Sequence, residues 1–431
     1  MHGHAARVAL ATALTLVLAG AAGAGGTSGF EVWAIDQSNT TGTTSGGAIH
    51  IYDGHALEGA AAASAVSERI DLGGAATSLC LAQTGTAPVR PHMVFFNSGR
   101  THAVLSFVAT GHVLFLDAAA RTPVACIDVG AQAHAAVPSP DESYVVVANQ
   151  NGKLLQRIET DYAANTFTLD AAATLDLATG TTPSGALRQD PVLRPDNAPI
   201  CPLVESTSRL AFVTLRGGGL FVVDSRATPM RIVAEYDRET VHGNGCGGVE
   251  TDGKMYVDSG GGTATNLSEF DVYAFALGAF GLSPSPPNTP APKLVVSQDD
   301  REHTDAHGVT LTKHGRYLWV ADRAGNRIVV IETATDEVVG ELSLAGELSS
   351  DPSPDLLELS PQGNRVFVTL RGSLPLSGDP HASTGNTPGL GVIRVEAGGR
   401  MGELQAIARI SNVDAGGIDR ADPHGLRVRQ R

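Results

Sequence analysis

Short apolar runs separated by turn residues dominate the pattern of hydrophobic and polar positions along this chain. A typical stretch is "SRLAFVTLRGGGLFVVD", in which two apolar runs flank a glycine turn, and "GRYLWVADRAGNRIVVIE" follows the same plan. Runs of this length that are rich in valine, leucine and threonine and are bounded by glycine, aspartate or asparagine are typical of β-strands. The pattern therefore predicts many strand-turn-strand units and no long helix.

Each hairpin is extended by a further apolar segment on either side, as in "HGVTLTKHGRYLWVAD" before the turn and "DEVVGELSL" after it. Four antiparallel strands per unit correspond to one blade of a β-propeller. The average repeat is about 56 residues. The second strands of seven such units lie near Val32, Val104, Val146, Phe212, Tyr256, Trp319 and Phe367.

The two ends of the chain predict how the ring closes. The first unit lacks a preceding strand, and the last segment, "DPHGLRVRQR", has the pattern of an inner strand with no blade after it. Pairing of this segment with the first unit removes an open sheet edge. We therefore predict an all-β fold, a seven-bladed β-propeller with four-stranded antiparallel blades, formed by residues 29–431 as one domain and closed by the C-terminal strand in blade one. A β-sandwich array is the main alternative, since β-helix rungs are shorter and more regular.

The amino terminus has the pattern of an export signal. A weakly basic start is followed by an apolar stretch over residues 8–22 and then by the small residues "AAGAGG". This stretch is shorter than the roughly 20 residues that a spanning helix needs. We therefore predict a cleaved signal peptide at residues 1–25 and a periplasmic or secreted, monomeric protein with no membrane span after cleavage.

Charge and composition exclude some partners. The formal net charge is −15 and no lysine or arginine block occurs, which disfavours nucleic acid and anionic membrane surfaces. No P-loop, G-x-S-x-G or H-E-x-x-H motif is present, and we expect no nucleotide cofactor. Four cysteines in an exported chain are compatible with two disulfides in any of three pairings.

The repeat also brings metal-binding residue types to one structural position. Counting back twelve residues from four second strands, and matching the closing strand through the shared Asp-x-His-Gly pattern, reaches His92, His134, His307, Asp355 and His424. In two other units the count falls beside Cys201 and Cys246. The start of an inner strand faces the mouth of the central channel. Imidazole, thiolate and carboxylate groups are ligands for first-row transition metals.

We therefore predict a metal site at the channel mouth. Its ligands are His92, His134, His307, His424 and Asp355, with further candidates His242, His303, Cys201 and Cys246, and with Asp305 and Asp422 as candidate acceptors that orient the imidazoles. Each residue also has a plain alternative: a histidine caps backbone groups, an aspartate forms a turn, and the glycine after a histidine permits a turn. A Cys201–Cys246 disulfide, which leaves Cys80 and Cys126 to pair, would remove both thiolates.

Several segments carry a family resemblance. "YVVVANQNG", "SPQGNRVFV" and the hexapeptide "FVTLRG", which occurs at residues 212–217 and 367–372, resemble the YVTN repeat. The chain is similar to exported YVTN and YncE-like seven-bladed propellers of the lactonase-like superfamily over nearly all its mature length. The repeated hexapeptide is interpreted as duplicated scaffold, with Arg216 and Arg371 near the loop face, where each forms a salt bridge or meets an anionic ligand.

The resemblance implies a fold but not one activity, because such propellers include binding proteins, lactonases and metal enzymes. The first hypothesis is a copper, zinc or small-ligand site at the channel mouth, since the channel histidines resemble those of nitrous oxide reductase and thiocyanate dehydrogenase, which use more histidines. The second is a non-catalytic YncE-like propeller that binds an envelope protein or peptide. The third is a lactonase-like hydrolase or copper oxidoreductase, and the sequence does not decide whether the protein is an enzyme.

Overall fold

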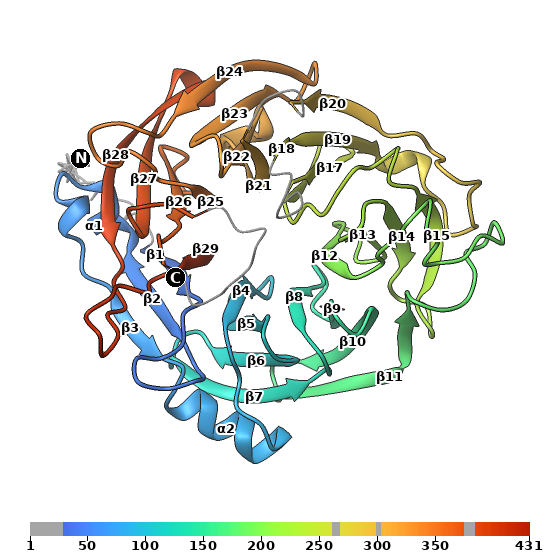
Figure 1. Cartoon of the computed structure of the whole chain (residues 1–431), viewed down its shortest axis with the longest axis horizontal. Coiled ribbons are helices and arrows are strands. Elements are labelled where there is room, and N and C mark those ends of the chain that lie inside the picture. Colours follow the sequence, from blue (N-terminus) through green and yellow to red (C-terminus); the bar gives the residue numbers. More distant parts are fainter. Residues whose placement is uncertain (1–28, 261–267, 299–302, 375–383) are drawn as a thin grey trace, which may run out of the picture.

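The computed structural model is a ring of seven blades around a central channel (Figure 1). It describes residues 29–260, 268–298, 303–374 and 384–431. The signal peptide predicted at residues 1–25 lies outside the described residues. The predicted fold class is confirmed, and the domain boundaries stay a prediction.

Each blade is a four-stranded antiparallel sheet, and blade six carries one extra short strand. From the channel outward, the first four blades are β29 (Pro423–Gln430), β1 (Phe30–Asp36), β2 (Ala48–Asp53), β3 (Glu68–Asp71); β4 (Pro91–Phe96), β5 (His102–Phe107), β6 (His112–Asp117), β7 (Thr122–Asp128); β8 (Ala133–Pro138), β9 (Tyr144–Asn149), β10 (Leu154–Asp161), β11 (Thr166–Asp176); and β12 (Pro199–Val204), β13 (Leu210–Leu215), β14 (Leu220–Asp224), β15 (Arg231–Tyr236). The last three are β16 (Gly248–Thr251), β17 (Lys254–Ser259), β19 (Asp271–Ala276), β20 (Lys293–Ser297); β21 (Thr304–Leu311), β22 (Tyr317–Asp322), β23 (Arg327–Glu332), β24 (Glu337–Ser343), with β18 (Ser268–Glu269) parallel to β21; and β25 (Pro354–Leu359), β26 (Arg365–Leu370), β27 (Gly389–Glu396), β28 (Met401–Arg409).

The ring closes as predicted. The C-terminal strand β29 pairs antiparallel with β1, with Val32 opposite Val428 and Trp33 opposite Arg427. All seven predicted second-strand centres lie in the second strand of a blade. This closure leaves the first blade built from both ends of the described chain, as the adjacent blue and red strands in Figure 1 show.

The core consists of apolar layers between neighbouring blades. Trp33 of blade one packs in a cluster with Val94 and Leu105 of blade two, and Trp319 of blade six packs with Val366 of blade seven. Because both faces of the central strands are covered, β1 is buried along its whole length, its charged residues Glu31 and Asp36 included. Burial of these side chains supplies most of the stabilisation of the ring.

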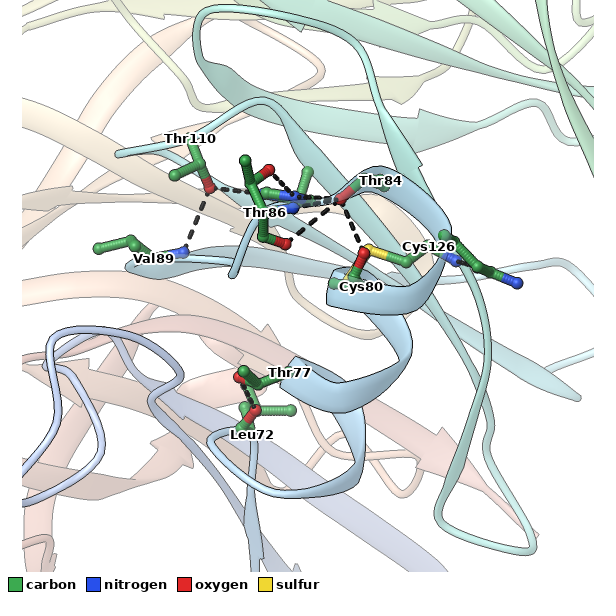
Figure 2. Close-up of a disulfide and its surroundings, with 10 residues drawn as sticks. Leu72, Thr77, Cys80, Thr84, Thr86, Val89, Thr110 and Cys126 are labelled. Carbon is green, nitrogen blue, oxygen red and sulfur yellow. Dashed lines mark hydrogen bonds between the residues drawn. A yellow bond between two sulfur atoms is a disulfide. The ribbon is translucent and has the colours of Figure 1, made fainter.

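Helices are few and lie in connections. They are α1 (Gly54–Glu58), α2 (Ala75–Thr84) and the short 3-10 turns η1 (Ala62–Ser64), η2 (Leu277–Ala279), η3 (Lys313–Gly315) and η4 (Ala397–Gly399). Helix α2 packs on β7, and the Cys80–Cys126 disulfide joins the two elements (Figure 2). The backbone N–H of Cys126 donates to the side-chain oxygen of Gln83 at 2.7 Å, which ties the helix to the blade. Among the described helices, none has the length and apolarity needed to cross a membrane.

The repeated hexapeptide is scaffold, and its threonine shows why. The hydroxyl of Thr214 donates to the backbone carbonyl of Gly245 at 2.6 Å, and the hydroxyl of Thr369 donates to the carbonyl of His424 at 2.7 Å. Ser106 occupies the same register in blade two and donates to the carbonyl of His134 at 2.8 Å. Each hydroxyl therefore joins the second strand of one blade to the inner-strand start of the next blade.

Removing this hydroxyl is expected to destabilise the ring. In a Thr369→Val variant the buried carbonyl of His424 and the backbone N–H of Leu356 both lose a partner. We expect the free energy of unfolding to fall by about 1–3 kcal/mol, as measured by chemical denaturation. Thr369→Ser keeps the hydroxyl and is the control; a Val variant as stable as the Ser variant would contradict the assignment.

Candidate functional site

The predicted inner-strand positions come together around the channel mouth. The imidazole rings of His92 and His424 stack with centroids 3.9 Å apart, those of His92 and His134 are 4.5 Å apart, and those of His307 and His424 are 5.2 Å apart. The four histidines come from four different inner strands, β4, β8, β21 and β29. Convergence of four imidazoles on one region is an arrangement that a metal ion requires.

A β-bulge directs each of these side chains. The pairing register shifts at Pro91/Val94 in β4, at Ala133/Ala135 in β8 and at Pro354/Leu357 in β25, so the ring residue sits within the irregular step. The strands β12, β21 and β29 carry the same shift. Because a bulge turns a side chain out of the regular pleat, the residue at this position faces its counterparts in other blades instead of packing between blades.

The glycine that follows two of the histidines is needed for close packing of inner strands. A Cβ atom on Gly308 would lie 2.1 Å from the carbonyl oxygen of Asp355, and one on Gly425 would lie 2.5 Å from that of His92. Neither glycine has a left-handed backbone conformation. The Asp-x-His-Gly pattern therefore marks close approach between neighbouring blades, and the turn role considered from the sequence is wrong.

Three of the histidines are oriented through Nδ1. The Nδ1 atom of His424 lies 2.6 Å from Oδ2 of Asp355, and Nδ1 of His307 lies 2.7 Å from Oδ1 of the same carboxylate. Nδ1 of His92 lies 3.0 Å from Oε1 of Gln37. For His424 and His92, whose contacts are hydrogen bonds, the carboxylate and amide oxygens accept, so Nδ1 carries the proton and Nε2 keeps its lone pair. The contact of His307 with Asp355 lacks hydrogen-bond geometry.

The Nε2 atoms of the ring histidines differ in their partners. Nε2 of His92 is hydrogen-bonded to Nε2 of His134 at 3.3 Å, a contact that an ion would have to replace. Nε2 of His424 is buried and has no hydrogen-bond partner in the part of the chain that the structure describes. A buried polar nitrogen with no partner is uncommon and costs free energy, so this atom is a candidate for coordination.

The carboxylate of Asp355 is at the centre of a charge network. It is fully buried and contacts Arg371 Nη1 at 2.9 Å, with Arg323 Nη1 at 3.7 Å. Burial alone would raise the pKa of Asp355, but the positive or protonatable groups of His424, His307 and the two arginines outweigh burial and hold the pKa well below its usual range. Asp355 is therefore ionised, and its charge is shared between imidazoles and guanidinium groups.

The environment favours the neutral form of two of the imidazoles. Burial, assisted by the charge of Arg323, lowers the pKa of His307 to about 4 despite the opposing effect of Asp355. Burial and the neighbouring His424 and His134 lower the pKa of His92 well below its usual value. Neutral imidazole is the form that can bind a metal ion.

Asp355 is placed to orient imidazoles rather than to coordinate. Its oxygens lie at hydrogen-bond distances of 2.6 and 2.7 Å from the two Nδ1 atoms. Two ligands of one tetrahedral ion, each about 2.1 Å from it, would lie roughly 3.4 Å apart. The sequence predicted that Asp305 and Asp422 would orient the imidazoles. In the structure it is Asp355 that contacts two of the imidazoles directly.

Asp305 and Asp422 support the two arginines. Asp305 accepts from Arg323 at 2.8 and 3.1 Å, and Asp422 accepts from Arg371 at 2.7 and 3.1 Å. Asp422 also accepts from the amide of Gln37 at 2.9 Å, so it acts on His92 through that side chain. Sequence reasoning missed Gln37 and Arg323. The repeat could have identified Arg323, because Arg323 directly follows the second strand of its blade, as Arg216 and Arg371 do in their blades.

The further candidate ligands have other partners. Cys201 is bonded to Cys246, and Cys80 to Cys126, so in this oxidised form Cys201 and Cys246 supply no thiolate. His242 contacts Asp271 through Nδ1 at 2.7 Å, and His303 is exposed ahead of β21. Among the described residues, the groups spaced for a metal are His307, Asp355 and His424, and His134, Cys201 and Cys246. His92, His242 and His303 belong to neither group, and neither group contains more than two of the four ring histidines.

An apolar cavity lies in the channel beside the ring. It has a volume of about 150 Å³ and is lined by side chains from all seven inner strands, among them Met93, Val137, Leu203 and Val309, and by Cys201 and Cys246. The disulfide therefore forms part of the cavity wall. The loops at residues 260–268 and 373–389 lie mostly outside the described residues.

Comparison with known proteins supports the fold. No protein-family model and no curated protein matches the chain. The periplasmic gluconolactonase of Pseudomonas aeruginosa superposes with a TM-score of 0.57 at 13% identity, over 92% of this chain and 99% of that one. A protein of Lactobacillus plantarum gives 0.54 at 14% identity over 93% and 99%, and a protein of Bacteroides uniformis provisionally assigned as a 6-phosphogluconolactonase gives 0.53 at 12% over 92% and 99%.

These structures define the class. The chain has the seven-bladed propeller architecture, and propellers described as lactonases are among its structural neighbours. At this level of identity the likeness concerns the fold alone. The narrower resemblance to YncE-like proteins stays a prediction, as does export, with which the two disulfides are compatible.

Proposed function

We propose that this protein is a metal-binding propeller that holds one transition-metal ion, copper or zinc, at the mouth of its channel. The ligands are the Nε2 atoms of His92, His307 and His424, with His134 as the fourth. One observation carries the proposal: Nδ1 of His92 and Nδ1 of His424 are hydrogen-bonded to acceptors and Nδ1 of His307 lies 2.7 Å from Asp355, while Nε2 of His424 is buried without a partner among the described residues.

Hydrogen bonding at the far nitrogen supports this assignment. In metal sites a histidine ligand almost always donates its other N–H to a carboxylate or carbonyl oxygen, which fixes the ring and makes the ligating nitrogen more basic. Asp355 supplies both oxygens for His307 and His424, and Gln37 supplies one for His92. An all-imidazole donor set suits copper and zinc, and divalent copper binds such nitrogen sites more tightly than the other first-row ions.

No feature of the histidine ring favours one of the alternative functions over metal binding. A gluconolactonase-like hydrolysis would use the same imidazoles as bases or as ligands of a metal that polarises a carbonyl. A YncE-like interaction with an envelope protein or peptide requires only the fold and its loops. Both stay hypotheses, and so does a copper oxidoreductase.

Metal analysis of protein purified without a histidine tag tests the proposal. After loading with Cu(II) or Zn(II) and removal of excess, we expect one ion per chain. His424→Ala is expected to weaken metal binding by at least about tenfold. Loss of a group that only orients a ligand typically costs about that much affinity, and loss of the ligand itself should cost no less. His55→Ala, which removes an exposed histidine on α1, is the control and is expected to bind as the wild type does.

A chain that takes up neither metal after loading would rule the proposal out. Binding that is unaffected by His424→Ala but lost in His55→Ala would place the site elsewhere on the surface. Calorimetric titration of the apo protein separates these outcomes, since it reports both the number of sites and the affinity.

A further inference from the structure

A second group of ligand atoms adjoins the histidine ring and contains a disulfide. A ring nitrogen of His134 and the sulfurs of Cys201 and Cys246 lie within 4.8 Å of one another. Cys201 is 1% exposed and Cys246 is 6% exposed, and both line the channel cavity. Two sulfurs and one imidazole at this spacing are a ligand set as soon as the sulfurs are thiolates.

The backbone holds the two cysteines in place independently of the S–S bond. Cys201 lies in β12, and Cys246 lies two residues before β16. The hydroxyl of Thr214 accepts from the backbone N–H of Cys201 at 3.3 Å and donates to the carbonyl of Gly245 at 2.6 Å. Thr214 therefore joins the two inner strands, and reduction would leave both sulfurs beside His134.

We propose that reduction of the Cys201–Cys246 disulfide creates a second metal site, formed by the two thiolates and one nitrogen of His134. Thiolate-rich sites of this kind select Cu(I) and Zn(II) over harder cations. The site adds two thiolates that the histidine ring lacks, and it takes His134, the fourth ligand proposed for the ring, so that the first ion is then held by His92, His307 and His424. The oxidation state of one disulfide thereby decides how much metal the channel mouth holds, and which kind.

The reduction step balances with a dithiol as the co-reactant. One thiolate of the dithiol attacks a cysteine sulfur, the Cys201–Cys246 bond breaks and a mixed disulfide forms. The partner cysteine leaves as a thiolate in this step. The second thiol of the reductant then attacks the mixed disulfide and releases the cysteine held in it, and the reductant leaves as a cyclic disulfide. Two electrons and two protons pass to Cys201 and Cys246, and the thiol protons are released when the metal binds.

The other disulfide is a matched control. Cys80–Cys126 joins helix α2 to the outer strand β7, where its surroundings are threonine hydroxyls and backbone groups (Figure 2). In the described residues neither Cys80 nor Cys126 belongs to a group spaced for a metal. Cys80→Ala/Cys126→Ala therefore leaves Cys201 and Cys246 as the only cysteines of a chain that has four.

The experiment compares oxidised and reduced protein in that background. The protein is reduced with dithiothreitol, freed of reductant without oxygen and titrated with Co(II) and, in competition with a chelator, with Cu(I). We expect one further equivalent in the reduced form, with a thiolate-to-cobalt charge-transfer band that the oxidised form lacks. Adding His134→Ala is expected to weaken the further site at least about tenfold.

Blocking the thiols is expected to abolish the further site. The variant Cys201→Ser/Cys246→Ser is tested first. If it does not fold, the reduced control protein is alkylated with iodoacetamide, and mass spectrometry checks that Cys201 and Cys246 are modified. No further equivalent on reduction, or a further equivalent that survives the block, would overturn the proposal. The oxidised protein reports the histidine site in the same titrations, so failure of one site is distinguished from failure of the other.

Discussion

Replacing Asp355 with asparagine is expected to lower the free energy of unfolding by about 3–5 kcal/mol and to weaken metal binding about 10- to 100-fold. The carboxylate is fully buried and contacts Arg371, His307 and His424. Asparagine keeps the shape but removes the charge, which leaves a buried guanidinium group undercompensated. Its single amide oxygen can accept from only one of the two Nδ1 atoms, so one imidazole loses the hydrogen bond that fixes its tautomer.

Denaturation and metal titration measure these two effects separately. Asp196→Asn is the control. Asp196 pairs with Arg216, which occupies in blade four the position that Arg371 occupies in blade seven, but the side chain of Asp196 is 28% exposed. An exposed pair of this kind contributes about 0–1 kcal/mol. If Asp355→Asn binds metal as tightly as the wild type does, the imidazoles are not oriented for a metal, and the proposed site is wrong.

Replacing Glu31 with glutamine is expected to destabilise the protein by about 3 kcal/mol at neutral pH, because it breaks a buried ion pair that closes the ring. Glu31 lies in β1, is 1% exposed, and accepts from Arg121 and from Arg429 and Arg431 at 3.2 and 2.8 Å. Arg429 belongs to β29, and Arg431 follows that strand. One carboxylate thus holds the closing strand against both β1 and blade two.

The effect of Glu31→Gln is expected to vanish in acid. Burial alone would raise the pKa of Glu31, but hydrogen bonds from Arg121 and Trp33 outweigh it and lower the pKa to about 2. A group whose pKa is lower in the folded than in the unfolded protein stabilises the fold above the unfolded value, about 4.3, and loses this contribution as the pH falls to about 2. Unfolding curves of both proteins should differ by a constant amount near neutral pH and converge below pH of about 4. A difference that stays constant down to pH of about 2 would contradict this role.

The blade count and the histidine ring were predictable because a propeller repeats one unit. A fixed offset from the second strand reaches the same place in every blade, so His92, His134, His307 and His424 were found without any contact information. The bulges that aim these side chains leave only a partial signal: proline precedes the ring position in "PHMV" and "PDLL" but not in "AHAA". Local backbone irregularity depends on packing between neighbouring blades.

Contacts between segments that are far apart in the chain could not be predicted from the sequence. Gln37 orients His92 across 55 residues, and Asp422 holds Gln37 across 385. Gln37 directly follows β1 as Arg323 follows β22 and Arg371 follows β26, so its position belongs to the repeat, but its contacts depend on the folded ring. The disulfide pairing likewise depended on which inner strands are neighbours in space. The repeat thus predicted the ring positions, while the contacts that orient their side chains required the folded ring.

The closing strand also sets the order in which the protein is assembled. His424 lies in β29 and Asp422 directly before it, yet their partners Asp355 and Gln37 lie in the blade before it and directly after β1. The four imidazoles therefore come together only once β29 has been made and has paired with β1. Capture of the proposed ion would follow closure of the ring, and a product without residues 423–431 would lack both His424 and the closing strand.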